Sequence, residues 1–145
     1  PNVFAGYWED EEATARVLDS DGWLHTGDLA VVDDDGFLYL VDRAKDLIIV
    51  SGFNVFPAEV EEVLLEHPAI ERAAVIGVAH PHTGEAVRAY VVTRDGFSIE
   101  EDDAIEFAAS RLARYKCPNK VTFVEQIPTG LGGKVIRRVL RESGN

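Results

Sequence analysis

Residues 70–94, IERAAVIGVAHPHTGEAVRAYVVTR, contain two apolar runs that are separated by a short polar segment. The runs at 70–80 and 85–94 are rich in Val and other strand-forming residues. The segment between them, PHTG, carries the Pro and Gly that are typical of turns. We therefore predict two strands that flank a turn at 81–84.

A helix is predicted before these strands, in FPAEVEEVLLEHP, residues 56–68. Pro57 suits the first turn of a helix, several glutamates suit the positive end of the helix dipole, and Pro68 ends the segment. The helical spacing of the apolar residues predicts a buried stripe, which consists of Val60, Val63, Leu64 and Leu65.

The surrounding sequence supplies further elements. Strands are predicted at 47–52 and 120–128, and helices at 98–114 and 135–143. Ser98 is the predicted N-cap of the longer helix, because Glu101 stands three residues on, as in a capping box. Together the elements predict an α+β fold, a small mixed sheet flanked by helices.

The N-terminal part of the chain differs in character. Residues 1–42 carry eleven Asp/Glu and one Arg, and their turn signals predict a hairpin with strands at 29–33 and 37–42 after a short helix at 9–18. Nothing in so short and acidic a segment explains how its aromatic residues Phe4, Tyr7, Trp8 and Trp23 would be buried. We expect residues 1–43 to be the truncated edge of a larger domain, and residues 44–145 to form a separate small domain.

The charge distribution narrows the class of protein. The 145 residues carry a net charge of −12, which argues against a nucleic-acid partner, although residues 110–145 hold eight Lys/Arg and only two Asp/Glu. This basic segment is either a solvated surface or a local field that attracts phosphates. Cys117 is the single cysteine, so no internal disulfide can form, and we expect a cytoplasmic protein. No base stands beside Cys117 in the sequence, which argues against a catalytic thiol.

Lys134 is the strongest candidate for a catalytic residue. It lies in GLGGKVIRR, residues 130–138, which does not match the Walker phosphate loop because Pro128 and Val135 stand where that motif needs Gly and Ser/Thr. The glycines allow close approach to a ligand, and the ammonium could neutralise a carboxylate or phosphate in a transition state. The alternative is an incidental lysine on an exposed loop.

Other polar motifs are weaker. DRAKD, residues 42–46, is either an inter-domain hinge or a solvated turn with weak ion pairs. Asp28 follows a glycine in HTGD, and a carboxylate there could accept hydrogen bonds from a ribose diol. His80 and His82 share a turn, but we expect no metal site. No apolar run approaches the roughly 20 residues that a membrane span needs, which leaves only peripheral association with a membrane.

In their order along the chain, four segments carry a family resemblance. GWLHTGDLA, DRAKDLIIVSGFNVFPAEVEEVLLEHP, GEAVRAYVV and RLARYKCPNKVTFVEQIPTGLGGKVIRRVLRE together resemble the adenylate-forming superfamily of acyl-CoA synthetases, luciferases and peptide-synthetase adenylation domains. SGFNVFPAEVE is most similar to the fatty acyl-CoA synthetases. The resemblance implies that residues 44–145 are a small mobile C-terminal lid, and that residues 1–43 are the edge of a large N-terminal adenylation domain.

The resemblance also implies roles for particular residues. Lys134 matches the lysine that contacts the carboxylate and the α-phosphate during adenylation. Asp28 and Arg43 match residues near the ribose of ATP and AMP. Lys45 matches the hinge residue of the family. Ser51 and Gly52 match a loop that lies beside the path of pantetheine. Two positions depart from the family pattern, Thr129 and Gly132, and they suggest a more mobile loop.

The implied activity has two steps. ATP and a fatty acid give an acyl-adenylate, and coenzyme A then displaces AMP after the lid rotates about Lys45. Mg²⁺ would be held mainly by the N-terminal domain, and this fragment alone is expected to be inactive. Ile49 replaces a lysine of the luciferases and favours thioester formation over light emission. Two alternatives remain: a ligase that loads an acyl-carrier protein, and a stand-alone interaction module that uses the basic segment.

Overall fold

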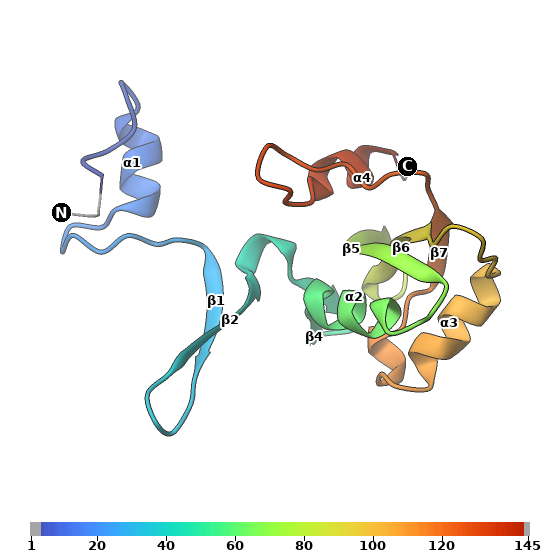
Figure 1. Ribbon diagram of the computed structural model, residues 1–145. Helices are drawn as coiled ribbons and strands as arrows, with labels where there is room; N and C mark the ends of the chain where they lie inside the picture. The colour runs from blue at the N-terminus through green and yellow to red at the C-terminus, as the bar shows by residue number, and fades with distance from the viewer. Residues whose placement is uncertain (1–3, 144–145) are drawn as a thin grey trace. The chain divides into compact units, whose positions relative to one another are not determined.

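The structure is a computed structural model that describes residues 4–143. It divides into two compact units, Pro1–Lys45 and Asp46–Asn145 (Figure 1). The boundary that the sequence predicts, after residue 43, lies just before this division.

The first unit consists of a short helix and a hairpin. Helix α1, Glu11–Val17, begins at the Asp10 side chain, whose Oδ1 accepts a hydrogen bond from the Ala13 backbone N–H at 2.8 Å. Strands β1, Asp28–Val32, and β2, Leu38–Arg43, pair antiparallel, which confirms the predicted hairpin. None of residues 4–45 is buried, and Trp8 and Trp23 are 89% and 74% exposed. This unit therefore has no core of its own.

The second unit is built on a five-stranded mixed sheet in the order β4-β3-β6-β5, with β7 also paired to β6. All pairs are antiparallel except β6 with β7, which are parallel. The predicted strands at 70–80 and 85–94 form its central hairpin. The strand bounds are β3 Ile48–Val50, β4 Phe53–Val55, β5 Ile70–His80, β6 Gly84–Thr93 and β7 Lys120–Phe123.

Helices cover both faces of this sheet, as the predicted α+β fold requires (Figure 1). Helices α2, Pro57–Leu65, and α3, Glu101–Ala109, share one apolar cluster with the sheet, and α4, Arg137–Ser143, shares a second one. Successive residues of a strand contribute alternately to the two clusters, because their side chains point to opposite faces of the sheet. Two single-turn 3₁₀ helices complete the unit, η1 Ala44–Asp46 and η2 Arg114–Lys116.

Three expectations need correction. The helix predicted from Ser98 begins at Glu101, so its N-cap position is Glu100, whose side chain makes no capping hydrogen bond. The Glu101 carboxylate accepts a hydrogen bond from Val121 N–H at 2.9 Å. Leu65 does not belong to the buried stripe: it is 42% exposed, whereas Val60 and Leu64 are fully buried. Strand β4 was not expected, because its three residues are too few to show an alternating pattern.

No helix among residues 4–143 has both the length and the apolar character that crossing a bilayer would require.

Candidate functional site

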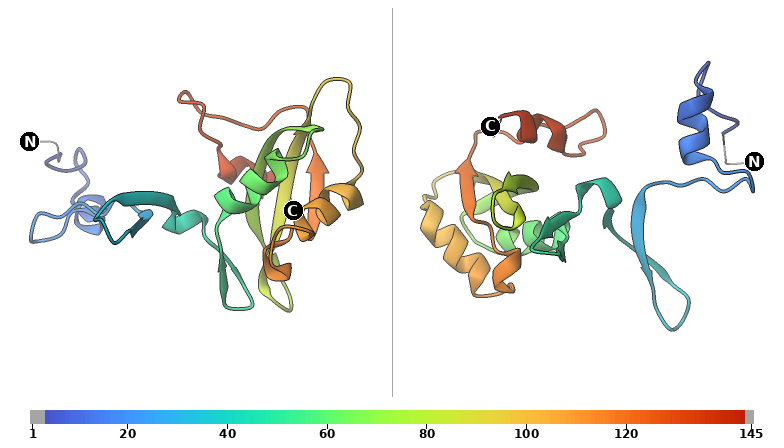
Figure 2. Two further views of the ribbon diagram at one scale, coloured as in Figure 1. Left: turned by 60° about the horizontal axis from the view of Figure 1, so that its bottom comes forward. Right: turned by 180° about the vertical axis from the view of Figure 1, so that it is seen from behind.

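Lys134 lies on a closed loop between β7 and α4, which stands away from the sheet (Figure 2). Gly130 N–H donates to Lys134 O at 2.9 Å, and Ile136 N–H donates to Pro128 O at 2.8 Å, so the loop is tied at its base. Gly133 has φ +72°, a conformation that a glycine adopts without strain. Among the described residues, no side chain pairs with the Lys134 ammonium, which is exposed and free to meet an anion.

Asp28 and Arg43 meet in the first unit. They are register partners at one end of the β1–β2 hairpin, and Arg43 Nε lies 3.1 Å from Asp28 Oδ1. The Arg43 guanidinium also donates to Thr26 O at 3.0 Å, so its orientation is fixed from two sides. Both side chains are partly exposed. The pair offers a carboxylate acceptor and a cation at one point, which suits a ligand that carries hydroxyl groups next to a phosphate.

Ser51 and Gly52 form the turn between β3 and β4, and both have positive φ, 51° and 84°. A left-handed conformation is uncommon for serine and is held here by the surroundings, since Ser51 N–H donates to Thr83 O at 2.8 Å. Among the described residues other than its two chain neighbours, no atom lies within 4 Å of where a Gly52 Cβ would be, so the backbone angle and not crowding favours glycine. Ser51 borders an open cavity of about 420 Å³, which is also lined by His80, Thr83, Arg114, Tyr115 and Cys117.

Glu85 supports this turn and was not singled out from the sequence. Its Oε2 accepts a hydrogen bond from Ile49 N–H at 2.7 Å, on the strand that leads into Ser51. Gly77 on the neighbouring strand makes room for this carboxylate, because a Cβ there would lie 2.6 Å from Glu85 Oε1 and 3.1 Å from Ile48 Cγ2. A glycine inside a strand often marks such a close approach, and Gly77 was the only available signal.

Replacing Gly77 with alanine is expected to destabilise the chain by about 1–3 kcal/mol, because the added methyl group displaces the Glu85 carboxylate and overpacks against Ile48. The measurement is urea denaturation of the wild-type and variant chains. The matched control is Gly132→Ala, since no atom lies within 4 Å of its Cβ position. Equal midpoints for both variants would show that the site tolerates the methyl group.

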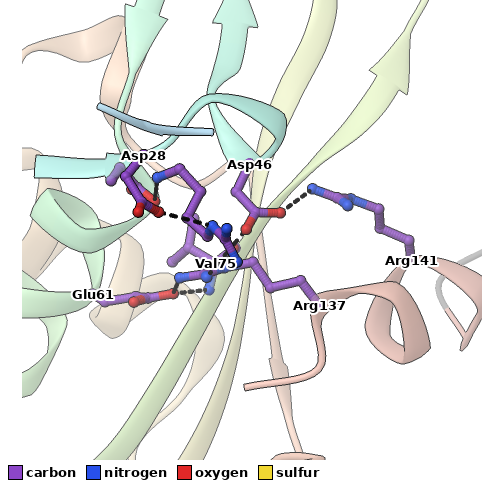
Figure 3. A network of polar contacts seen from close by, with 8 residues as sticks. Asp28, Asp46, Glu61, Val75, Arg137 and Arg141 are labelled. Carbon is purple, nitrogen blue, oxygen red and sulfur yellow. Dashed lines mark hydrogen bonds and ion pairs between the residues drawn. The ribbon is translucent and has the colours of Figure 1, made fainter. Parts of the chain in front are cut away.

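Lys45 is exposed, and the two compact units divide after it. The following residue, Asp46, is buried and forms ion pairs with α4: Arg141 Nη2 lies 3.1 Å from its Oδ1 and Arg137 Nη1 3.6 Å from its Oδ2. Figure 3 shows Arg137 between Asp46 and Glu61, in a network that joins segments far apart in the sequence. The motif DRAKD predicts either a hinge or a solvated turn with weak ion pairs, and neither interpretation includes the ion pairs of Asp46 with α4.

The remaining candidates behave as ordinary structural residues. Burial raises the pKa of the Cys117 thiol, which keeps it protonated and poorly nucleophilic at neutral pH. His80 Nδ1 lies 2.8 Å from Thr83 Oγ1, a contact that stabilises the turn. Within residues 4–143, no group of three or more His, Cys, Asp or Glu side chains is placed to hold a metal ion.

The basic C-terminal segment is largely neutralised from within the chain. Ion pairs join Arg111 to Glu66, Lys116 to Glu59 and Arg141 to Asp46. Lys134 has no ion pair among the described residues, and neither have Arg114 and Lys120, but Lys134 alone of these three lies on the glycine loop. No hydrogen bond or ion pair among the described residues links Lys134 to the Ser51–Gly52 turn, so these two predicted site elements occupy separate loops of the same unit.

Comparison with known proteins identifies the family of this chain. Residues 59–134 match the family described as the AMP-binding enzyme C-terminal domain. A 3-[(3aS,4S,7aS)-7a-methyl-1,5-dioxo-octahydro-1H-inden-4-yl]propanoyl:CoA ligase of Rhodococcus jostii is 48% identical over 97% of this chain and 27% of its own length. A long-chain-fatty-acid–CoA ligase of Salmonella typhimurium is 46% identical over 98% of this chain and 25% of its own length.

A solved structure extends the likeness to three dimensions. The crystal structure of ATP-bound MatB from Rhodopseudomonas palustris superposes with a TM-score of 0.92 at 42% identity, over 99% of this chain and 28% of that one. The chain therefore spans about a quarter of the length of the relatives that it matches.

Proposed function

Because the chain belongs to the AMP-binding enzyme C-terminal domain family, we propose that it is the C-terminal part of an ATP-dependent fatty acid–CoA ligase. Its similar proteins include acyl-CoA ligases, among them a long-chain-fatty-acid–CoA ligase. A larger N-terminal domain, corresponding to the part of those relatives that the chain does not span, would supply the acid-binding pocket. Residues 1–43 would be the edge of that domain, and residues 44–145 its mobile lid.

The exposed ammonium of Lys134, which pairs with no side chain in the part of the chain that the structure describes, is the observation that carries the proposal. In the first step, a fatty acid carboxylate attacks the α-phosphate of ATP, the acyl-adenylate forms and pyrophosphate leaves. Negative charge gathers on the reacting oxygens, and a positioned cation stabilises it. The arginines of α4 already form ion pairs within the chain. Lys134, on the loop that precedes α4, is therefore the cation that remains available for the reaction.

The other predicted residues divide between the two steps. The Asp28–Arg43 pair would bind the ribose hydroxyls of ATP and AMP, and a carboxylate held beside a guanidinium suits that role. The turn at Ser51 and Gly52 would face the second step, in which the thiol of coenzyme A attacks the acyl carbonyl and AMP leaves. Lys45, at the division between the units, would be the hinge of the rotation that exchanges the two loops.

Mg²⁺ has no assigned ligand in this chain. The cation would be bound together with the phosphates of ATP, mainly by the N-terminal domain. The cytoplasmic location expected from the single cysteine stays a prediction.

The test is a pair of assays on the full-length protein. We expect exchange of pyrophosphate into ATP that depends on added fatty acid, followed by thioester formation with coenzyme A. Absence of fatty-acid-dependent exchange would contradict the proposed ligase. If exchange occurs but the acyl group passes only to an acyl-carrier protein, the acceptor assignment is wrong. A stand-alone interaction module has little support, because most of the basic segment is paired internally.

A further inference from the structure

Asp46 is a buried carboxylate directly after the hinge position. It is 6% exposed, and burying a carboxylate is unfavourable unless the charge is paired. Two guanidinium groups of α4 provide that pairing, with Arg141 Nη2 at 3.1 Å and Arg137 Nη1 at 3.6 Å from its two oxygens. The chain that leaves Lys45 is therefore tied to a helix about 90 residues further on.

Arg137 makes the more extensive set of contacts. Its side chain is 17% exposed, and besides Asp46 it contacts Glu61 Oε1 at 2.8 Å and donates from Nε to Val75 O at 3.2 Å. Glu61 Oε1 also accepts from Val75 N–H at 2.8 Å, so its place is fixed independently. One guanidinium thus joins the end of η1, helix α2, strand β5 and helix α4 (Figure 3).

The same arginine stands at the base of the Lys134 loop. Arg137 is the first residue of α4 and comes three residues after Lys134. The loop from Pro128 to Ile136 closes on itself through backbone hydrogen bonds, and Leu131 at its outer end is fully exposed. Val135, next to Lys134, packs against the apolar cluster that α4 shares with the sheet, and Arg137 adds polar contacts at the same base. The position of Arg137 therefore contributes to where the base of the loop is held.

We propose that Asp46 and Arg137 are positioning residues for adenylation: they fix the base of the Lys134 loop to the first residue after the hinge. This inference rests on the proposed function. Rotation of the chain at Lys45 is then transmitted directly to the loop, so the ammonium reaches the α-phosphate in one orientation and is withdrawn in the other. Neither residue touches substrate, and both act through the placement of Lys134.

The experiment uses the full-length protein with Arg137→Lys, which keeps the charge next to Asp46 but cannot contact Asp46, Glu61 and Val75 O together. We expect pyrophosphate exchange to fall about 10- to 100-fold, because small displacements of a reacting group have effects of that size. Thioester formation from supplied acyl-adenylate should stay within about twofold of wild type, since that step does not use the loop.

The matched control is Arg138→Lys, at the next position of the same helix. This side chain is 82% exposed, and its one ion pair among the described residues is with Glu142, at 3.8 Å. Both half-reactions should stay within about twofold. Asp46→Asn removes the charge but keeps the shape of the side chain, and it should show the same selective loss of pyrophosphate exchange. This second variant keeps the proposal testable if the Arg137 variant fails to fold. The double variant should lose little more than the worse single one, as expected of residues that act as a unit.

Each outcome of these assays either supports or contradicts the positioning role. Selective loss of exchange supports the positioning role. Equal loss of both half-reactions reveals a purely structural network and overturns it, as does an unchanged exchange rate. A wild-type protein without fatty-acid-dependent exchange would overturn the proposed function itself, which separates the two failures.

Discussion

Replacing Lys134 with alanine in the full-length protein is expected to slow acyl-adenylate formation about 10²–10³-fold, the usual cost of removing one group that stabilises charge in a transition state. Among the described residues, no other side chain compensates the ammonium, so its charge is fully available to substrate. The loop carries it away from the sheet, and no neighbouring cation of α4 could take its place without breaking an ion pair.

The measurement separates the half-reactions. Fatty-acid-dependent pyrophosphate exchange reports the first step, and thioester formation from supplied acyl-adenylate reports the second, which should stay within about twofold of wild type. Lys120→Ala is the matched control, because Lys120 is an exposed lysine of the same basic segment and lies on strand β7. Lys134→Arg should restore only part of the rate, since a planar guanidinium does not replace a compact ammonium. Equal loss of both half-reactions would refute the division of labour between the loops.

The parts of the fold that depend on local patterns could be predicted from the sequence. The β5–β6 hairpin and helix α2 have regular apolar spacing and clear Pro or Gly boundaries, and both lie where that spacing placed them. The N-cap at Ser98 failed for a tertiary reason. Glu101 satisfies the backbone of β7 at Val121 and so cannot complete a capping box.

The candidate site depends even more than the fold on tertiary contacts, which the sequence does not reveal. Lys134 could be found because glycines surround it in the sequence. Asp28 and Arg43 could be paired only once the hairpin register was known, since they are register partners across β1 and β2. The Asp46–Arg137 contact joins residues from opposite ends of the second unit, and no local sequence pattern predicts it. Each arginine of a basic helix is equivalent in sequence, and only packing decides which are buried.

Replacing Lys45 with proline is expected to lower steady-state turnover by at least about tenfold, because proline fixes φ near −65° and also restricts the preceding residue. Lys45 lies in a single-turn 3₁₀ helix at the division between the compact units, where a change of backbone angle would redirect everything that follows. The Asp46–Arg137 and Asp46–Arg141 contacts hold the next residue to α4, so the proposed hinge does not extend beyond Lys45 on that side.

The two half-reactions, assayed separately as for Lys134, should respond unequally to this proline. One should stay within about twofold of wild type and the other should be nearly lost, because the unit is held in one orientation and only one loop can then reach the substrate. Lys45→Ala is the control: it removes the exposed ammonium but leaves the backbone free, so both steps should persist. Unchanged turnover in the proline variant would mean that the rotation does not pass through this residue. Equal damage by alanine and proline would mean that the side chain, and not the backbone, is what the reaction needs.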